Sequence, residues 1–132
     1  MKKSELEFGN KPSEADLEKY LLQLPSNLPR SYIDFLRKHN GANGDLPIQP
    51  LYFQLWKIDE LIQANQEYEI KQYLPNYFGI GENGGGELIA INLENQKIFA
   101  IPFIVMEEKD AWLIAESFED FEKLFGFTNE IA

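Results

Sequence analysis

The sequence predicts an α+β fold: a largely antiparallel sheet with helices packed on it. Helical patterns come first in the 132-residue chain, strand patterns come next, and one helix closes it. Strands and helices therefore do not alternate, as they would in a parallel βαβ sheet. Two adjacent strand patterns are joined by only three polar residues, which is hairpin spacing. The length, with no repeat or linker, favours one domain over residues 1–132 with a core at about 13–126.

Two helices are expected in the first third of the chain. Residues 12–24 carry apolar side chains at helical spacing, and Ser13 is suited to cap the helix with Asp16 three residues later as a capping box. Residues 28–41 have a proline at the start, a basic cluster near the end and an Asn-Gly pair that favours a left-handed stop.

The middle of the chain is predicted to contain a loop, a strand and a long helix. Residues 42–50 are rich in turn-forming residues and are expected to be a loop. Residues 51–56 have the composition of a strand. Residues 57–74 are expected to form one continuous helix that ends at Pro75, with Tyr68 on its apolar face.

The last third predicts strands and a closing helix. Strands are expected at residues 77–81, 87–93, 97–103 and 111–116, the second and third forming the hairpin. Residues 117–126 predict a helix capped by Ser117, with a phenylalanine-rich stripe and a terminal glycine.

Composition and charge exclude several classes of functional site and partner. The chain has no cysteine, which excludes disulfides, thiolate nucleophiles and zinc–sulfur sites. With 12 basic and 22 acidic residues the net charge is −10, so it repels nucleic acid and anionic membranes and suits a basic partner. The first ten residues lack the apolar segment of a secretory signal, so the cytoplasm is the expected location. No motif requires a cofactor or a metal.

The segment GIGENGGGELIAINL, residues 79–93, has the spacing G-x-G-x-x-G of a dinucleotide fingerprint. A strand pattern comes directly after the glycines, however, and not the helix that such a site needs. A Walker loop is excluded because Gly86 precedes Glu87 and Leu88 instead of Lys and Ser or Thr. We therefore expect a turn between two strands, in which glycine supplies positive φ and allows close backbone approach.

No catalytic group stands out. His39 is the only histidine and is expected to act as a cation at a helix C-terminus. Adjacent acids, such as the pairs at 59–60, 107–108 and 119–120, could serve glycosidase chemistry, but 22 acids produce such pairs by chance. Trp56 and Trp112 are expected to pack in the core, although a half-exposed tryptophan could anchor a partner.

Four segments, in this order and spacing, resemble the SUKH superfamily, which includes Smi/Knr-type regulators of fungal cell-wall assembly and many bacterial immunity proteins. They are LPRSYIDFLRKHNG, LYFQLWKIDELIQANQEY, IGENGGGELIAINLENQKIFAI and AESFEDFEKLF, and together they span residues 28–125. The matching positions are Leu28-Pro29 and Asn40-Gly41 at the ends of a helix, Trp56 before the next helix, Gly81 and Gly84 to Gly86 at the strand entry, and Ser117-Phe118 at the last helix.

The chain departs from that pattern at two positions. The family often has Asp in the Gly-rich turn and in the next strand, where this chain has Asn83 and Asn92. If those acids serve a partner, the contact is altered here; if they shape turns, Asn substitutes easily.

The resemblance implies a non-enzymatic protein-binding role, and for bacterial members the neutralisation of a cognate protein toxin, commonly a nuclease. The contact surface is then expected to combine acids with aromatic anchors on turns and strand-edge loops. The candidate residues are Glu82, Glu87, Glu107, Glu108, Asp110 and Trp112. Surface solubility is the simpler interpretation of each.

Two alternatives remain open. A Smi/Knr-type adaptor that binds a cellular protein would also be non-enzymatic, but such regulators usually carry long additional regions. A carboxylate-based hydrolase would need two acids facing each other in a pocket, at least one with a raised pKa. The sequence leaves the toxin and the oligomeric state undetermined.

Overall fold

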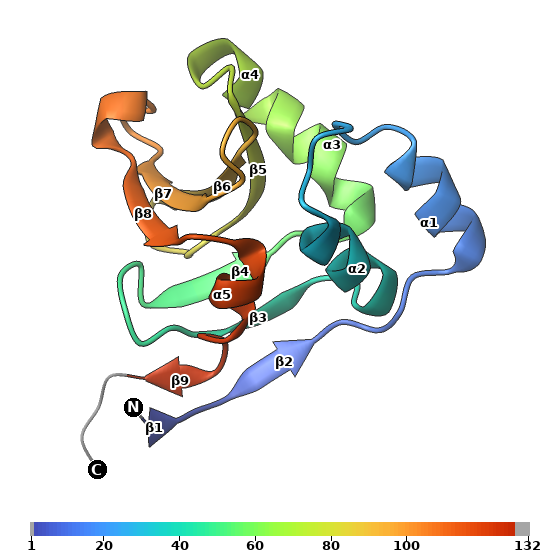
Figure 1. Cartoon of the computed structure of the whole chain (residues 1–132), viewed down its shortest axis with the longest axis horizontal. Coiled ribbons are helices and arrows are strands. Elements are labelled where there is room, and N and C mark those ends of the chain that lie inside the picture. Colours follow the sequence, from blue (N-terminus) through green and yellow to red (C-terminus); the bar gives the residue numbers. More distant parts are fainter. Residues whose placement is uncertain (1, 129–132) are drawn as a thin grey trace.

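A computed structural model describes residues 2–128. Seven strands form one sheet in the order β2-β3-β4-β5-β6-β7-β8, with every neighbouring pair antiparallel (Figure 1). The strands are β2 (Leu6–Phe8), β3 (Ala42–Asp45), β4 (Tyr52–Leu55), β5 (Tyr77–Glu82), β6 (Glu87–Asn92), β7 (Ile98–Pro102) and β8 (Trp112–Ala115). A separate pair joins β1 (Lys2–Lys3) to β9 (Phe127–Thr128).

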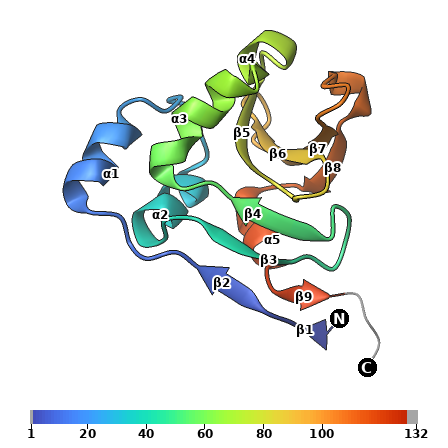
Figure 2. The ribbon, with the colours of Figure 1, turned by 180° about the vertical axis from the view of Figure 1, so that it is seen from behind.

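The helices are α1 (Glu14–Leu21), α2 (Arg30–Lys38), α3 (Ile58–Glu67), α4 (Ile70–Tyr73) and α5 (Phe118–Glu122), with a short 3₁₀ helix η1 (Glu108–Asp110). The sheet is strongly curled, and α1, α2 and α3 gather at one side of it in both views (Figures 1 and 2). None of the helices in the described part of the chain has the length and apolar character of a membrane span. The predicted α+β single-domain fold is confirmed.

The core lies on both faces of the interior strand β6. Every side chain from Leu88 to Ile91 is fully buried, as in strands that are covered on two sides. On one side an aromatic cluster joins α2, β4 and α5: Phe35 and Phe118 pack edge to face at 5.4 Å, and Phe53 stacks on Phe125 at 4.1 Å. This cluster confirms the apolar stripe expected for the closing helix.

Local signals set the helix ends. The Ser13 hydroxyl accepts a hydrogen bond from the backbone N–H of Asp16 at 3.2 Å, and the Ser117 hydroxyl accepts one from Asp120 at 3.1 Å. Both predicted caps are confirmed. Helix α2 ends at Lys38, and Gly41 takes a positive φ of 86° at the entry to β3.

The prediction of a loop at residues 42–50 is wrong for its first four residues. Ala42–Asp45 forms β3, which pairs with β2 on one edge and β4 on the other. The Ala-Asn-Gly-Asp sequence has low strand propensity, but pairing on both edges satisfies its backbone groups and outweighs that preference. The N-terminal strand that completes this pairing carries no clear sequence pattern.

The prediction of one helix over residues 57–74 is also wrong. Glu69 takes left-handed backbone angles, φ 53° and ψ 41°, and separates α3 from α4. At 3.6 residues per turn, an unbroken helix would put Ile70 about half a turn away from the buried face of Leu61. The break lets both Ile70 and Leu61 be fully buried. Burial of apolar surface thus overrides helix continuity.

Candidate functional site

The glycine-rich segment between β5 and β6 is a turn organised by Asn83. Its side-chain oxygen accepts hydrogen bonds from the backbone N–H groups of Gly85 at 2.9 Å and Glu87 at 3.0 Å. Gly84 and Gly86 have positive φ values of 72° and 101°. Because Asn83 occupies these two N–H groups, they are not available to cradle a phosphate. The predicted turn is confirmed.

The first two glycines of the segment have a different role. A Cβ at Gly81 would collide with the backbone carbonyl of Gln54 on β4, and one at Gly79 would lie 2.6 Å from Cδ1 of Ile70. They permit close approach of β5 to β4 and α4, as the sequence predicts.

The β5–β6 turn and the connection between β7 and β8 lie at the same end of the sheet. Glu87 pairs with Pro102 across β6 and β7, and the backbone N–H of Phe103 donates to the carbonyl of Gly86 at 2.9 Å. The connection continues through the exposed helix η1 to β8.

The six predicted contact residues belong to two segments, the β5–β6 turn and the segment from the β7–β8 connection into β8. Glu82 and Glu87 are half-buried beside the turn, and Glu87 accepts a hydrogen bond from Asn83 Nδ2 at 3.0 Å. Glu107, Glu108 and Asp110 are exposed on the β7–β8 connection, where Glu107 pairs with Lys109 at 3.2 Å.

Two of these acids lie near different tyrosines. Burial chiefly raises the pKa of Tyr68, and the negative charges of Glu82 and Glu67 raise it further. Burial likewise raises the pKa of Tyr77, with a smaller contribution from Glu108.

Trp112 is half-buried at the start of edge strand β8. Its indole N–H is shielded from solvent and has no hydrogen-bond partner in the described part of the chain. Trp56 is buried, as expected, and stacks against Tyr68. Of the two tryptophans, neither presents its ring freely on the surface.

The exposed aromatic surface lies beside Trp56 instead. Tyr68 stacks on two rings, Trp56 at 6.0 Å and 11° between ring planes, and Phe103 at 4.6 Å and 29°. Tyr68 keeps 40% of its surface exposed. The stack joins α3 to the β7–β8 connection and holds the tyrosine ring in place.

We call the cavity beside this stack the aromatic groove. It measures about 470 Å³ and is lined by Glu67, Tyr68, Tyr73, Phe103, Ile104, Val105, Met106 and Glu107. Tyr73 and Val105 are about half-exposed, and Ile104 is 96% exposed. A grouping of exposed apolar side chains with acids at its border is typical of a protein-binding surface.

Sequence reasoning missed most of the groove. Helical spacing puts Tyr68 on an apolar face but does not indicate that its side chain is exposed. The expected helix over residues 57–74 includes Tyr73, whereas in the structure α3 ends at Glu67 and Tyr73 lies in the separate helix α4. The apolar run from Ile98 continues past Pro102 to Met106, longer than a hairpin strand needs. That excess is the signal that could have indicated residues 104–106.

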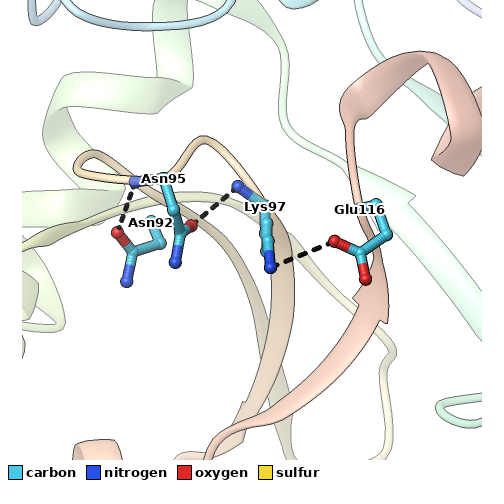
Figure 3. Close-up of polar contacts among 4 residues, drawn as sticks. All are labelled: Asn92, Asn95, Lys97 and Glu116. Atoms are coloured by element: carbon cyan, nitrogen blue, oxygen red, sulfur yellow. Dashed lines mark hydrogen bonds and ion pairs between the residues drawn. The ribbon is translucent and has the colours of Figure 1, made fainter.

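Asn92, the other departure from the family pattern, also shapes a turn. Its side-chain oxygen accepts hydrogen bonds from the N–H groups of Glu94 and Asn95, and Asn95 in turn accepts one from Lys97 at 2.9 Å (Figure 3). Lys97 pairs with Glu116 at 3.1 Å, which ties this hairpin to the end of β8. Together with the contacts of Asn83, this supports turn shaping as the role of both positions.

A second cavity, of about 390 Å³, is the one whose lining most resembles what a carboxylate-based hydrolase would need. Its lining includes His39, Lys38, Glu119 and Glu122. Burial raises the pKa of Glu122, while Lys38 lowers it and Glu119 raises it slightly. The two glutamates are exposed and lie three residues apart along one side of the α5 segment, and the exposed Asp34 of α2 is the third acid of the lining.

His39 comes directly after α2 and stacks on Phe8 with ring centroids 4.3 Å apart. Within residues 2–128 no group of three His, Cys, Asp or Glu side chains is placed to hold a metal ion.

The comparisons with known proteins place the chain in a family. No curated protein matches it. A family model, described as SMI1 / KNR4 family (SUKH-1), matches residues 11–123, which include α1 to α4, the six strands β3 to β8 of the seven-stranded sheet, and α5. The chain therefore belongs to the SMI1 / KNR4 family (SUKH-1).

Proposed function

We propose that this protein is a cytoplasmic, non-enzymatic immunity protein that binds a cognate protein toxin and neutralises it by direct contact. The observation that carries the proposal is an exposed aromatic groove bordered by Glu67 and Glu107, in a chain whose acidic excess gives a net charge of −10. Family membership supports an immunity-type or Smi/Knr-type protein, and the charge favours the first of these roles.

The electrostatic argument concerns the toxin's own site. A nuclease binds phosphate through a basic cleft, so a protein that covers the cleft must present negative charge. Complementary fields also raise association rates by roughly 10- to 1000-fold, which favours capture before the toxin acts. Glu107, Glu108 and Asp110 are exposed on the β7–β8 connection, where they can reach a partner, and Glu82 ends β5 beside the glycine turn.

The first test is genetic. The neighbouring upstream gene is expected to encode a secreted protein with a basic C-terminal domain, and co-expression of the present chain should protect a host from that domain. A host that is killed equally with and without the chain would contradict the immunity role.

The second test concerns the acidic residues. Glu108→Lys combined with Asp110→Lys should weaken binding to the basic domain sharply and reduce its salt dependence, measured by calorimetry at two ionic strengths. Glu18→Lys with Asp34→Lys makes the same change in net charge on exposed positions of α1 and α2 and serves as the control. Equal affinities of the two double variants would remove the β7–β8 connection from the contact.

A further inference from the structure

We propose that the aromatic groove receives an apolar side chain that is flanked by lysine or arginine on a basic partner protein. This inference rests on the proposed function and deepens it, because it assigns the anchoring point of the contact to Tyr68 and Ile104.

The groove is preformed. Tyr68 is held by stacking on Trp56 and on Phe103, so its ring loses little freedom when a partner covers it. The apolar wall of the groove, residues 103–106, is held as well. The N–H of Phe103 donates to the carbonyl of Gly86, and the N–H of Glu107 donates to the carbonyl of Val105 at 2.9 Å. A rigid aromatic floor is the usual basis of an interface hot spot.

The exposure of the wall has no explanation inside the fold. Ile104 is 96% exposed and contributes almost nothing to the core. It stands next to Val105 and near Tyr73, so the exposed apolar surface is continuous rather than scattered. Such a patch is a site that a partner covers.

The border of the groove defines the chemistry of that partner. Glu67 and Glu107 line it, the charge of Glu82 acts on Tyr68, and no lysine or arginine is part of its lining among residues 2–128. Lys109, the neighbouring cation, is already paired with Glu107. An apolar side chain between basic residues would fill the groove and place its cations against these carboxylates.

The same charges disfavour two other occupants. A second copy of the chain would bring acidic border against acidic border between molecules of net charge −10. An anionic membrane would be repelled by the same carboxylates. We therefore assign the groove to a basic protein.

A defined peptide tests the chemistry without knowledge of the toxin. The probe is a capped peptide with one leucine between two Lys-Arg pairs, titrated into ¹⁵N-labelled protein. We expect amide shifts to be centred on Tyr68, Ile104 and Val105. A peptide with serine in place of leucine should bind about 10-fold more weakly or worse, as the burial of a leucine implies. A peptide with glutamate in place of the basic residues should not bind.

Matched variants locate the contact. Ile104→Ser should weaken binding of the leucine peptide about 10-fold, whereas Leu22→Ser, which removes an apolar side chain that is 87% exposed at the end of α1, should leave it unchanged. Both positions are too exposed for the change to prevent folding. Shifts centred elsewhere, or equal binding by both variants, would overturn the proposal.

Binding to the basic C-terminal domain encoded by the neighbouring gene tests this proposal separately from the proposed function. If that domain binds the wild type and Ile104→Ser equally, the groove is not the contact and the immunity role stands. If it does not bind but the peptide docks in the groove, the immunity role fails and the groove stands. A dimer in sedimentation, or binding to phosphatidylserine vesicles, that Ile104→Ser abolishes would assign the groove to those occupants and overturn the inference.

Discussion

The side-chain amide of Asn65 on α3 pairs with both backbone groups of Gly79 on β5. Its oxygen accepts from the Gly79 N–H at 2.8 Å, and its nitrogen donates to the Gly79 carbonyl at 2.9 Å. Strand β4 pairs with β5 only at Glu82 and Gly81 and does not reach Gly79. Asn65 thus takes the place of the missing strand and fixes α3 against the sheet beside the groove.

Asn65→Ala should lower the free energy of unfolding by about 2–4 kcal/mol, because it leaves the N–H and carbonyl of Gly79 without partners. Urea unfolding measures this as a shift of the midpoint. Gln66→Ala, an exposed change on the same helix, should stay within about 0.5 kcal/mol of the wild type.

Asn65→Asp adds a pH test of the same contact. A carboxylate can accept from the Gly79 N–H but would repel its carbonyl, so the aspartate pKa should be raised in the folded state. Stability relative to the wild type should therefore fall as the pH rises above the unfolded aspartate pKa of about 4. A pH-independent difference between pH 4 and pH 7 would argue against the two-sided contact.

Two glycines of the turn segment should respond very differently to alanine. Gly81→Ala forces a Cβ onto the carbonyl of Gln54 and should cost more than about 3 kcal/mol. Gly84→Ala meets no atom within 4 Å and has only a positive φ to overcome, so it should cost about 1 kcal/mol. Thermal unfolding gives the order, and a reversed order would contradict the close approach of β4 and β5.

Tyr32→Phe should stabilise the protein by up to about 1 kcal/mol, because the buried Tyr32 hydroxyl has no partner in the described chain. Burial raises the pKa of Tyr32 well above its ordinary value of 10.0. In the wild type, stability should fall as the pH rises past 10, since the unfolded tyrosine ionises and the folded one does not. The advantage of the variant should therefore grow between pH 9 and about pH 11, as measured by urea unfolding. A constant difference would mean that the hydroxyl ionises freely in the fold.

Glu69→Asn should raise the free energy of unfolding by about 0.5–1 kcal/mol, because asparagine tolerates the left-handed conformation that separates α3 from α4. The melting temperature would rise by roughly 2–4 °C in a chain of this size. Gln66→Asn introduces the same residue at a helical position and should be slightly destabilising. A loss of stability in the first variant would indicate that Glu69 makes a contact of its own.

Local chemistry made much of the fold predictable. The serine caps, the strands after residue 50, the glycine turn and the phenylalanine stripe of α5 all depend on residues close together in sequence. Strand β3 and the break at Glu69 do not. Ala42–Asp45 becomes a strand because β2 and β4 flank it, and Glu69 becomes left-handed because Ile70 must reach the core. Both depend on partners far along the chain.

The candidate site also has features that local sequence predicts and features that depend on distant contacts. The acidic charge, the absence of thiol chemistry, the glycine-rich turn and the family of the four segments could all be predicted from the amino-acid sequence. The three-dimensional packing was needed to show that Tyr68, directly after α3, and Ile104, from the β7–β8 connection, border one groove, and that the Trp112 indole N–H is enclosed. Charge and turn preferences are properties of single residues and their neighbours, whereas exposure depends on which distant segments cover a side chain.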